Sequence, residues 1–159
     1  MTGPIDASAS SRFPKYFTPE EANRMLPLLR AIVRDIVTLF RQIHDQKDRL
    51  NELAARHRRR PREADDDVYA AEVREMEREM EQDIEKLEAC IDELRQLGVQ
   101  LKDPVLGLID FPAKCGDRDV FLCWQLGEDT VAYWHDLDAG FAGRRPISEL
   151  PQHSDTVAR

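Results

Sequence analysis

The side chains best suited to chemistry lie in the last third of the sequence. They supply a carboxylate, a thiol, two indole rings, an imidazole and a guanidinium, on Asp110, Cys123, Trp124, Trp134, His135 and Arg144. An imidazole exchanges a proton near neutral pH, and a guanidinium binds carboxylate or phosphate groups. The group therefore indicates a small-ligand or metal-binding site, with catalysis as one variant, in which His135, Asp110 and Arg144 converge around a pocket.

The predicted strand pairing separates two of these side chains. We expect the last two strands to close around residues 127–130, which places Cys123 opposite Trp134 and one position away from His135. Cys123 and His135 then lie on opposite faces of the sheet, and only a one-residue register change or a bulge would join them in a nucleophilic pair or a shared metal site. We therefore expect Cys123 to be a buried apolar thiol, and we assign no catalytic residue, metal ion or cofactor.

The other candidates also have structural interpretations. Trp124 lies opposite Tyr133 in the predicted pairing, as expected for cross-strand packing. His135 ends its strand beside Asp136, where a carbonyl or carboxylate group can satisfy the imidazole. We favour these structural roles and keep the small-ligand or metal site as the alternative.

Motifs that would identify an enzyme are absent from the sequence. It contains no phosphate-binding glycine loop, nucleophile elbow, dinucleotide fingerprint or H-E-x-x-H zinc motif. No histidine follows a glutamate by three residues, so the glutamate-rich helices do not encode the Glu-x-x-His motifs of a di-iron bundle. We therefore favour a protein that is not an enzyme, and the alternative site keeps that question open.

A basic cluster offers a third kind of contact. Arg58, Arg59 and Arg60 precede Pro61, and guanidinium groups match the geometry of phosphates. The cluster has no interleaved aromatic residues for base stacking, and acidic residues follow within 63–67. We therefore expect a solvated turn and rank nucleic-acid contact last among the functions.

The first two thirds of the sequence are predicted to be helical. Thr18 can cap a helix that starts at the next residue, and Glu21 completes a capping box. Pro27 lacks the backbone N–H that a helix interior needs. We therefore predict a short helix over residues 19–25, a kink or break, and a long helix over 27–57.

Aliphatic residues at alternating steps of three and four predict that two long helices pack along one seam. In the first helix these residues are Leu29, Val33, Ile36, Phe40, Ile43, Leu50 and Ala54, and in the second they are Val73, Met76, Met80, Ile84, Leu87, Ile91 and Leu94. The second helix is predicted over 66–97. The charged turn at 58–66 then folds the region 16–98 into an antiparallel coiled-coil hairpin.

The hairpin leaves apolar residues outside its seam, at Ile32, Val37, Leu39 and Leu53. Exposed apolar stripes mark contacts, and a second copy of the hairpin would cover them in a four-helix arrangement. We therefore predict a homodimer. The leading functional prediction is a non-enzymatic binding or assembly protein that self-associates through the hairpin and docks an unidentified protein partner on its β module.

After Gly98 the pattern changes to short strand-forming segments separated by turn residues. These segments cover residues 99–101, 108–111, 120–126 and 131–135. We predict an antiparallel β-meander with a glycine-rich loop over 99–150, so the fold class is α+β. One face of this sheet should pack on the base of the hairpin, and the other on Phe141, the tail or a partner.

The chain has 159 residues, about one domain, and its net charge of -8 disfavours binding to nucleic acid or anionic membranes in general. Residues 1–15 predict a disordered lead and residues 151–159 a flexible tail. No apolar run is long enough to span a bilayer. Cys90, Cys115 and Cys123 lack C-x-x-C spacing, which fits the reducing cytoplasm.

Several stretches of the sequence are familiar from a known family. They are Tyr16-Phe17-Thr18, Glu21-Ala22-Asn23, Lys102-Asp103, Gly107-Leu108-Ile109-Asp110-Phe111-Pro112, Cys123-Trp124-Gln125-Leu126-Gly127-Glu128, Tyr133-Trp134-His135 and Gly140-Phe141-Ala142-Gly143-Arg144. On these motifs the chain resembles an uncharacterised bacterial family, domain of unknown function 2203, over residues 16–147. The resemblance implies no catalytic residue, ligand or partner.

Overall fold

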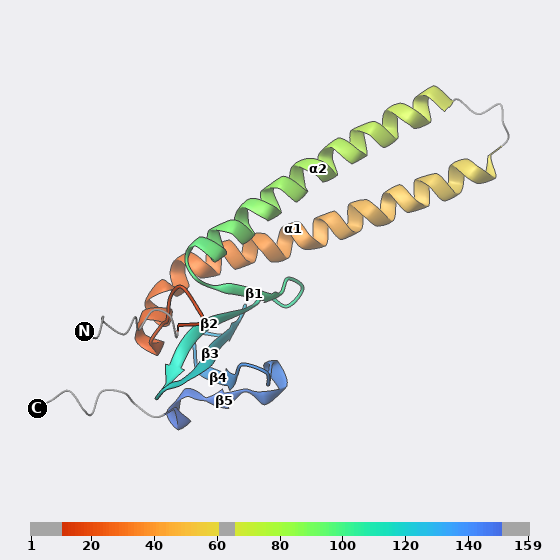
Figure 1. The fold of residues 1–159 in the computed structure, drawn as a ribbon. Coiled ribbons are helices and arrows are strands. Elements are labelled where there is room, and N and C mark those ends of the chain that lie inside the picture. Colours follow the sequence, from red (N-terminus) through yellow and green to blue (C-terminus); the bar gives the residue numbers. More distant parts are fainter. Residues whose placement is uncertain (1–10, 61–65, 151–159) are drawn as a thin grey trace, which may run out of the picture.

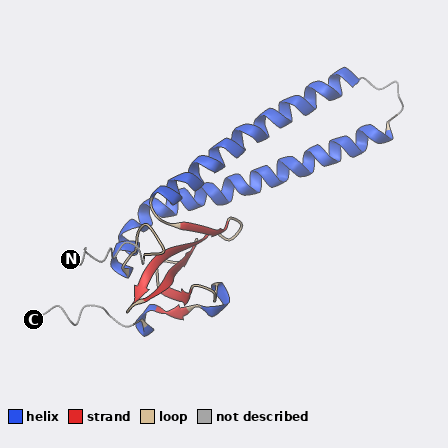
Figure 2. Ribbon diagram, in the orientation of Figure 1, coloured by secondary structure: helices blue, strands red, loops and turns tan. Residues whose placement is uncertain are grey.

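Two long helices extend away from one small antiparallel sheet (Figure 1). The structure is a computed structural model that describes residues 11–60 and 66–150. In chain order its main elements are helices α1 (Pro19–Arg59) and α2 (Asp66–Gln96) and strands β1 (Gln100–Asp103), β2 (Leu108–Cys115), β3 (Arg118–Gln125), β4 (Tyr133–Asp136) and β5 (Arg145–Pro146). The strands follow one another across the sheet in chain order, and each neighbouring pair is antiparallel. The predicted α+β fold, a helical hairpin followed by an antiparallel meander, is confirmed (Figure 2).

Helix α1 is one continuous helix, so the predicted break at Pro27 is wrong. Its first turn is capped as expected, because the backbone N–H of Glu21 donates to the Thr18 hydroxyl (3.1 Å) and the Thr18 N–H donates to the Glu21 carboxylate (3.3 Å). A proline inside a helix costs about 3 kcal/mol. Leu26 and Leu29, on either side of Pro27, are both buried, and burying a leucine contributes roughly 1.5–3 kcal/mol, which offsets that cost. The two predicted helices are therefore one element.

The core lies where the first half of α1 covers one face of the sheet (Figure 1). From the helix it takes Ala22, Leu26, Leu29, Ile32, Val33 and Ile36, and from β2, β3 and β4 it takes Ile109, Phe111, Ala113, Val120, Leu122, Trp124 and Trp134. Side chains alternate between the two faces along a strand, so these sheet residues share one face. This face is the inner face below, and the opposite one is the outer face.

Farther from the sheet, the hairpin consists of α1 and α2 alone (Figure 1). The two helices pack against each other, and Gln46 Nε2 donates to Asp83 Oδ2 across them (2.9 Å). Among the described residues from Val37 to Glu93, however, every side chain is half-buried or exposed. The seam of this outer part therefore stays partly open to water.

The pairing of β3 with β4 differs by one residue from the predicted register. Cys123 lies opposite Tyr133, and Phe121 lies opposite His135, whereas the prediction paired Cys123 with Trp134. A one-residue shift moves a whole strand's side chains to the other face relative to its neighbour. Cys123 and His135 therefore lie on the same face, and the predicted separation of these two residues is wrong.

The cause of this shift is a contact between the β3–β4 connection and helix α1. The backbone N–H of Val131 donates to Asn23 Oδ1 (2.7 Å), and Asn23 Nδ2 donates to the Val131 carbonyl (3.3 Å). The side chain of Asn23 thus takes the hydrogen bonds that Val131 would need to extend β4. The connection spans residues 126–132 instead of the predicted 127–130.

Strand β2 runs through Pro112 and beyond its predicted end at residue 111. The Pro112 carbonyl accepts a hydrogen bond from the backbone N–H of Phe17 (2.7 Å). The N and C=O groups of one strand residue point to the same side in an antiparallel sheet, so the missing N–H of Pro112 faces Phe17 and not β3. The proline therefore removes no hydrogen bond from the β2–β3 ladder.

The outer face is partly covered by the chain's own N-terminal segment. Phe13 packs on Phe121, with ring centroids 5.4 Å apart, and the Tyr16 hydroxyl donates to Asp119 Oδ2 (3.1 Å). The predicted disordered lead is therefore wrong for residues 11–15. Residues 1–10, the centre of the predicted charged turn at 61–65 and the predicted tail at 151–159 lie outside the described residues. Among the helices that the structure describes, none has the length and apolar character to cross a membrane.

Candidate functional site

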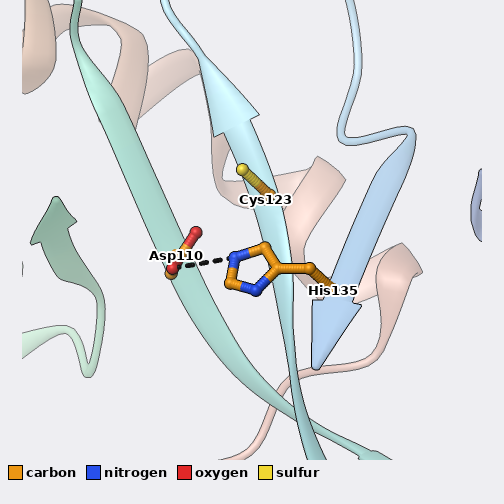
Figure 3. A group of neighbouring side chains, drawn as sticks. All are labelled: Asp110, Cys123 and His135. Carbon is orange, nitrogen blue, oxygen red and sulfur yellow. Dashed lines mark hydrogen bonds and ion pairs between the residues drawn. The ribbon is translucent and has the colours of Figure 1, made fainter. Parts of the chain in front are cut away.

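Three neighbouring strands bring a carboxylate, a thiol and an imidazole together on the outer face (Figure 3). Asp110 of β2 lies opposite Cys123 of β3, and His135 of β4 lies opposite Phe121, one step along the same face. All three side chains are at most 3% exposed. Their potential ligand atoms all lie within 4.8 Å of one another, so the three groups form one cluster.

The orientation of His135 is set by two hydrogen bonds. Nδ1 lies 2.7 Å from the carbonyl oxygen of Asp136, and Nε2 lies 3.1 Å from Asp110 Oδ2. A carbonyl can only accept, so Nδ1 carries a proton. One further proton is then shared between Nε2 and Oδ2, either as an imidazolium with a carboxylate or as an imidazole with a carboxylic acid. The proton can therefore move between the two groups without a change in the geometry of the pair.

The surroundings of His135 and Cys123 shift their pKa values in known directions. Burial lowers the pKa of His135, but its hydrogen bonds to Asp110 and Asp136 and the Asp110 charge outweigh that effect and raise the pKa above its usual value. Burial, assisted by the nearby Asp110 carboxylate, raises the pKa of Cys123 to about 12. Cys123 is therefore a protonated thiol at neutral pH, and it is not a ready nucleophile.

A small pocket lies against the buried pair. Its volume is about 220 Å³, and its walls are Lys102, Leu108, Asp110, Phe121, His135, Leu137, Asp138, Gly140 and Phe141. Pockets for drug-sized ligands measure roughly 300–1,000 Å³, so this one suits a smaller molecule. Cys123 is not among the residues that line it.

Arg144 interacts with Cys123 of the cluster and not, as the prediction required, with Asp110 or His135. Its guanidinium Nη2 is 2.7 Å from Glu128 Oε1, and it stacks over the rings of Tyr133 and Phe141 at 4.2 and 4.7 Å. These contacts attach the glycine-rich loop to the sheet. Arg144 is therefore a positioning residue for the loop that carries Phe141, and only Asp110 and His135 of the predicted three come together.

The two tryptophans of the predicted group lie on the inner face, away from the cluster. Trp124 Nε1 donates to the Glu128 carbonyl (3.0 Å), and Trp134 Nε1 donates to the Pro146 carbonyl (3.1 Å). Their rings belong to the core against α1. They hold the sheet in shape and do not form walls of the pocket.

Two wall residues of the pocket, Lys102 and Phe121, were not among the predicted site residues. Lys102 Nζ lies 5.0 Å from the centre of the Phe121 ring. Phe121 follows from the correct β3–β4 register, because it lies opposite His135, whereas Lys102 lies at an irregularity in the pairing of β1 with β2, and no local motif marks either residue. Correct strand pairing was the signal needed to find them.

The predicted basic cluster lies at the far end of α1. Arg58, Arg59 and Arg60 are all exposed, and Arg59 Nε donates to the Ala55 carbonyl (3.3 Å). Beside them the ring of His57 stacks on that of Tyr69, with centroids 3.7 Å apart. The cluster is thus a solvent-facing helix end with intramolecular contacts of its own.

The family model for an uncharacterised conserved protein, DUF2203, matches residues 15–147. The chain belongs to this family. DUF2203 therefore covers both the helical hairpin and the sheet with its cluster, and the resemblance of the sequence motifs is confirmed. No curated protein and no solved structure matches the chain.

Proposed function

We propose that this protein binds a small carboxylate-bearing ligand in the outer-face pocket above Asp110 and His135. The observation that carries the proposal is the position of this pair, buried in the sheet and yet lining the pocket. A buried ion pair adds little stability, because desolvation of the two groups offsets their attraction. A buried polar pair at the base of a cavity is better explained by binding than by stability.

The walls of the pocket indicate the class of ligand. Leu108, Phe121, Leu137 and Phe141 would contact an apolar body. Lys102 lines the pocket, is exposed and makes no ion pair with any of the described residues, so its ammonium group is available to a carboxylate. A short aliphatic or aromatic monocarboxylate fits these requirements.

Benzoate is a suitable probe, and NMR titration of the metal-free chain measures its binding. We expect saturable shifts of the His135 and Phe121 ring signals in the millimolar range, and a several-fold weaker response in Lys102→Gln because the carboxylate loses its cation. Lys15→Gln is the matched control, since Lys15 also lies over a phenylalanine ring, at 4.6 Å from the centre of Phe17. Absence of saturable shifts at His135 would overturn the proposal.

The hairpin supports a second candidate function, self-association. Its outer seam is only half-buried, and its two helices carry opposite charge: α1 has nine Lys and Arg against six Asp and Glu, whereas α2 has four against twelve. In a homodimer, α1 of one copy could pack on α2 of the other and close both seams. Light scattering on the purified chain, which reports mass, tests this directly.

The remaining predictions on partners and location fit this picture as proposals. A protein partner of the β module would meet the side chains of Val105, Leu106 and Phe141, which are 63%, 46% and 45% exposed. All three cysteines are free thiols, which supports the reducing cytoplasm as the compartment. The exposed Arg58, Arg59 and Arg60 keep nucleic-acid contact as the last-ranked proposal.

A further inference from the structure

We infer that Asp110, Cys123 and His135 bind one divalent transition-metal ion of the zinc type. The inference rests on the proposed pocket for one feature, the open coordination position, and otherwise on the cluster itself. The sequence argued against such a site because the predicted register placed Cys123 and His135 on opposite faces. The observed register places them on one face, beside Asp110.

The spacing of the donor atoms suits a single ion. The carboxylate oxygen, the thiol sulfur and the imidazole nitrogen all lie within 4.8 Å of one another. Around a tetrahedral zinc ion, with bonds of about 2.0–2.3 Å, neighbouring donor atoms are roughly 3.3–3.8 Å apart. Side-chain rotations that move each atom by about 1 Å would therefore complete the coordination without a change in the strands.

The hydrogen bond at the Nδ1 atom of His135 is of the kind that metal-binding histidines make. Its Nδ1–H donates to the Asp136 carbonyl (2.7 Å), which holds the ring so that Nε2 points at Asp110 and into the cluster. Histidine ligands of metals nearly always donate their other N–H to a carbonyl, a carboxylate or water in this way. The imidazole is therefore already oriented as a ligand.

Asp110 provides an independent indication. One of its oxygens bonds His135, while the other, Oδ1, is buried and has no hydrogen-bond partner of good geometry among the described residues; the Cys123 thiol, a weak donor, is the group that interacts with this carboxylate. A buried carboxylate oxygen without a partner is costly, and native structures rarely leave one. A bound cation would satisfy this oxygen.

The donor set also selects the class of metal. One sulfur, one nitrogen and one oxygen donor match the preferences of zinc and its neighbours, whereas calcium and magnesium require six or more oxygen ligands. Three protein ligands leave a fourth position free, and the pocket adjoins both Asp110 and His135. A carboxylate held by Lys102 could occupy that position, so the metal and the small ligand would share one site.

Cobalt titration of the full chain, stripped of metal by a chelator, tests the inference. We expect one equivalent of Co²⁺ to bind with the charge-transfer absorption of a cobalt–thiolate bond, and Zn²⁺ to displace it. Cys123→Ser should abolish that absorption and weaken zinc binding at least tenfold. Cys115→Ser is the matched control, because Cys115 is a half-buried thiol of the same sheet outside the cluster and should leave both unchanged.

Thermal unfolding provides a second readout that does not depend on the spectrum. Zn²⁺ should raise the melting temperature of the wild type and of Cys115→Ser but not of Cys123→Ser, whose fold is checked by circular dichroism. No saturable cobalt binding, or thiolate absorption that persists in Cys123→Ser, would overturn the metal site. If cobalt fails to bind while benzoate still shifts the His135 signals, the metal inference is wrong and the ligand proposal stands. If cobalt binds while benzoate causes no saturable shift, the ligand proposal is wrong and the metal inference stands.

Discussion

At the scale of single residues, the outer face contains two polar groups of different kinds. Asp110 and His135 are buried as a pair and line a pocket, whereas Asp119 lies near the surface and is held by Lys114 and Tyr16. The interactions of the Asp119 carboxylate with Lys114 and Tyr16 contribute to stability, and this contribution changes with pH as the carboxylate is protonated. The buried pair adds little stability and is better suited to binding.

The Asp119 carboxylate should make the free energy of unfolding depend on pH in the acidic range. Its hydrogen bond from Lys114, 2.7 Å away, outweighs desolvation and lowers the Asp119 pKa below the usual value. A lowered pKa adds stability above about pH 4, the pKa in the unfolded chain, and that stability is lost as the pH falls through the lower folded value. Asp119→Asn should therefore lower the free energy of unfolding by about 1 kcal/mol at neutral pH.

Urea unfolding of the wild type and of Asp119→Asn at several pH values measures this effect. The difference between the two should shrink as the pH falls below about 4, because protonation removes the same interaction from the wild type. Asp117→Asn, an exposed carboxylate in the adjoining turn, is the control and should show little difference at any pH. A gap between wild type and Asp119→Asn that is constant with pH would contradict the assignment.

Residue types indicated which side chains could do chemistry, but not how these side chains lie relative to one another. Asp110 and His135 lie together because their strands, β2 and β4, flank β3 on either side. Cys123 lies on the same face as these two residues only because the pairing of β3 with β4 differs by one residue from the prediction. The connection between these strands is held by Asn23, which lies in α1 far away in the sequence. A contact between such distant residues leaves no local pattern, so sequence periodicity alone could not show it.

At the scale of elements, local sequence signals predicted where the first helix begins, but they failed where tertiary packing opposed them. The capping box at Thr18 formed as predicted, since it needs only neighbouring residues. The sequence predicted a helix break at Pro27 and a strand end before Pro112, yet α1 and β2 continue through these prolines. In both cases the surroundings decide: Pro27 lies between buried leucines, and Pro112 turns its missing N–H away from the ladder.

The junction of the sheet with α1 depends on Gly107. Its φ of +69° favours glycine, and an added Cβ would lie 2.8 Å from the Cβ of Leu126 and 3.0 Å from Val33 Cγ1. Gly107→Ala should therefore lose roughly 2–4 kcal/mol of unfolding free energy, from backbone strain together with overpacking against α1. Chemical denaturation with a linear extrapolation measures the loss.

Gly116→Ala separates the two contributions. Gly116 has a similar φ of +64°, but an added Cβ would meet nothing within 4 Å. This variant should lose only the strain component, about 1 kcal/mol. Equal losses in the two variants would show that the close approach of the β1–β2 turn to α1 contributes nothing.

At the scale of the whole molecule, the described parts differ in how completely they are buried. The sheet and the first half of α1 form a closed core, whereas the outer hairpin has no buried side chain among its described residues from Val37 to Glu93. The pocket that we propose as a ligand site is thus complete in one copy. The hairpin is the part that gains most from a second copy.

Charge reversal on the hairpin tests whether the second copy binds as proposed. Arg41 and Arg49 of α1 are exposed on the helix that would face the acidic α2 of the other copy. Arg41→Glu with Arg49→Glu should weaken the dimer at least tenfold, because like charges then meet across the interface. Light scattering and sedimentation at micromolar concentration report the change, and added salt should weaken the wild-type dimer.

Complementary reversal gives the decisive control. A chain with Glu81→Lys and Glu88→Lys on α2 should also dissociate, and mixing it with the α1 variant should restore a dimer, because opposite charges again face each other. Arg145→Glu, an exposed change on β5 away from the hairpin, should leave the mass unchanged. A wild type that stays monomeric under these conditions excludes the homodimer and leaves the seam as a two-helix arm, whereas a mixture that fails to reassociate places the interface on another surface.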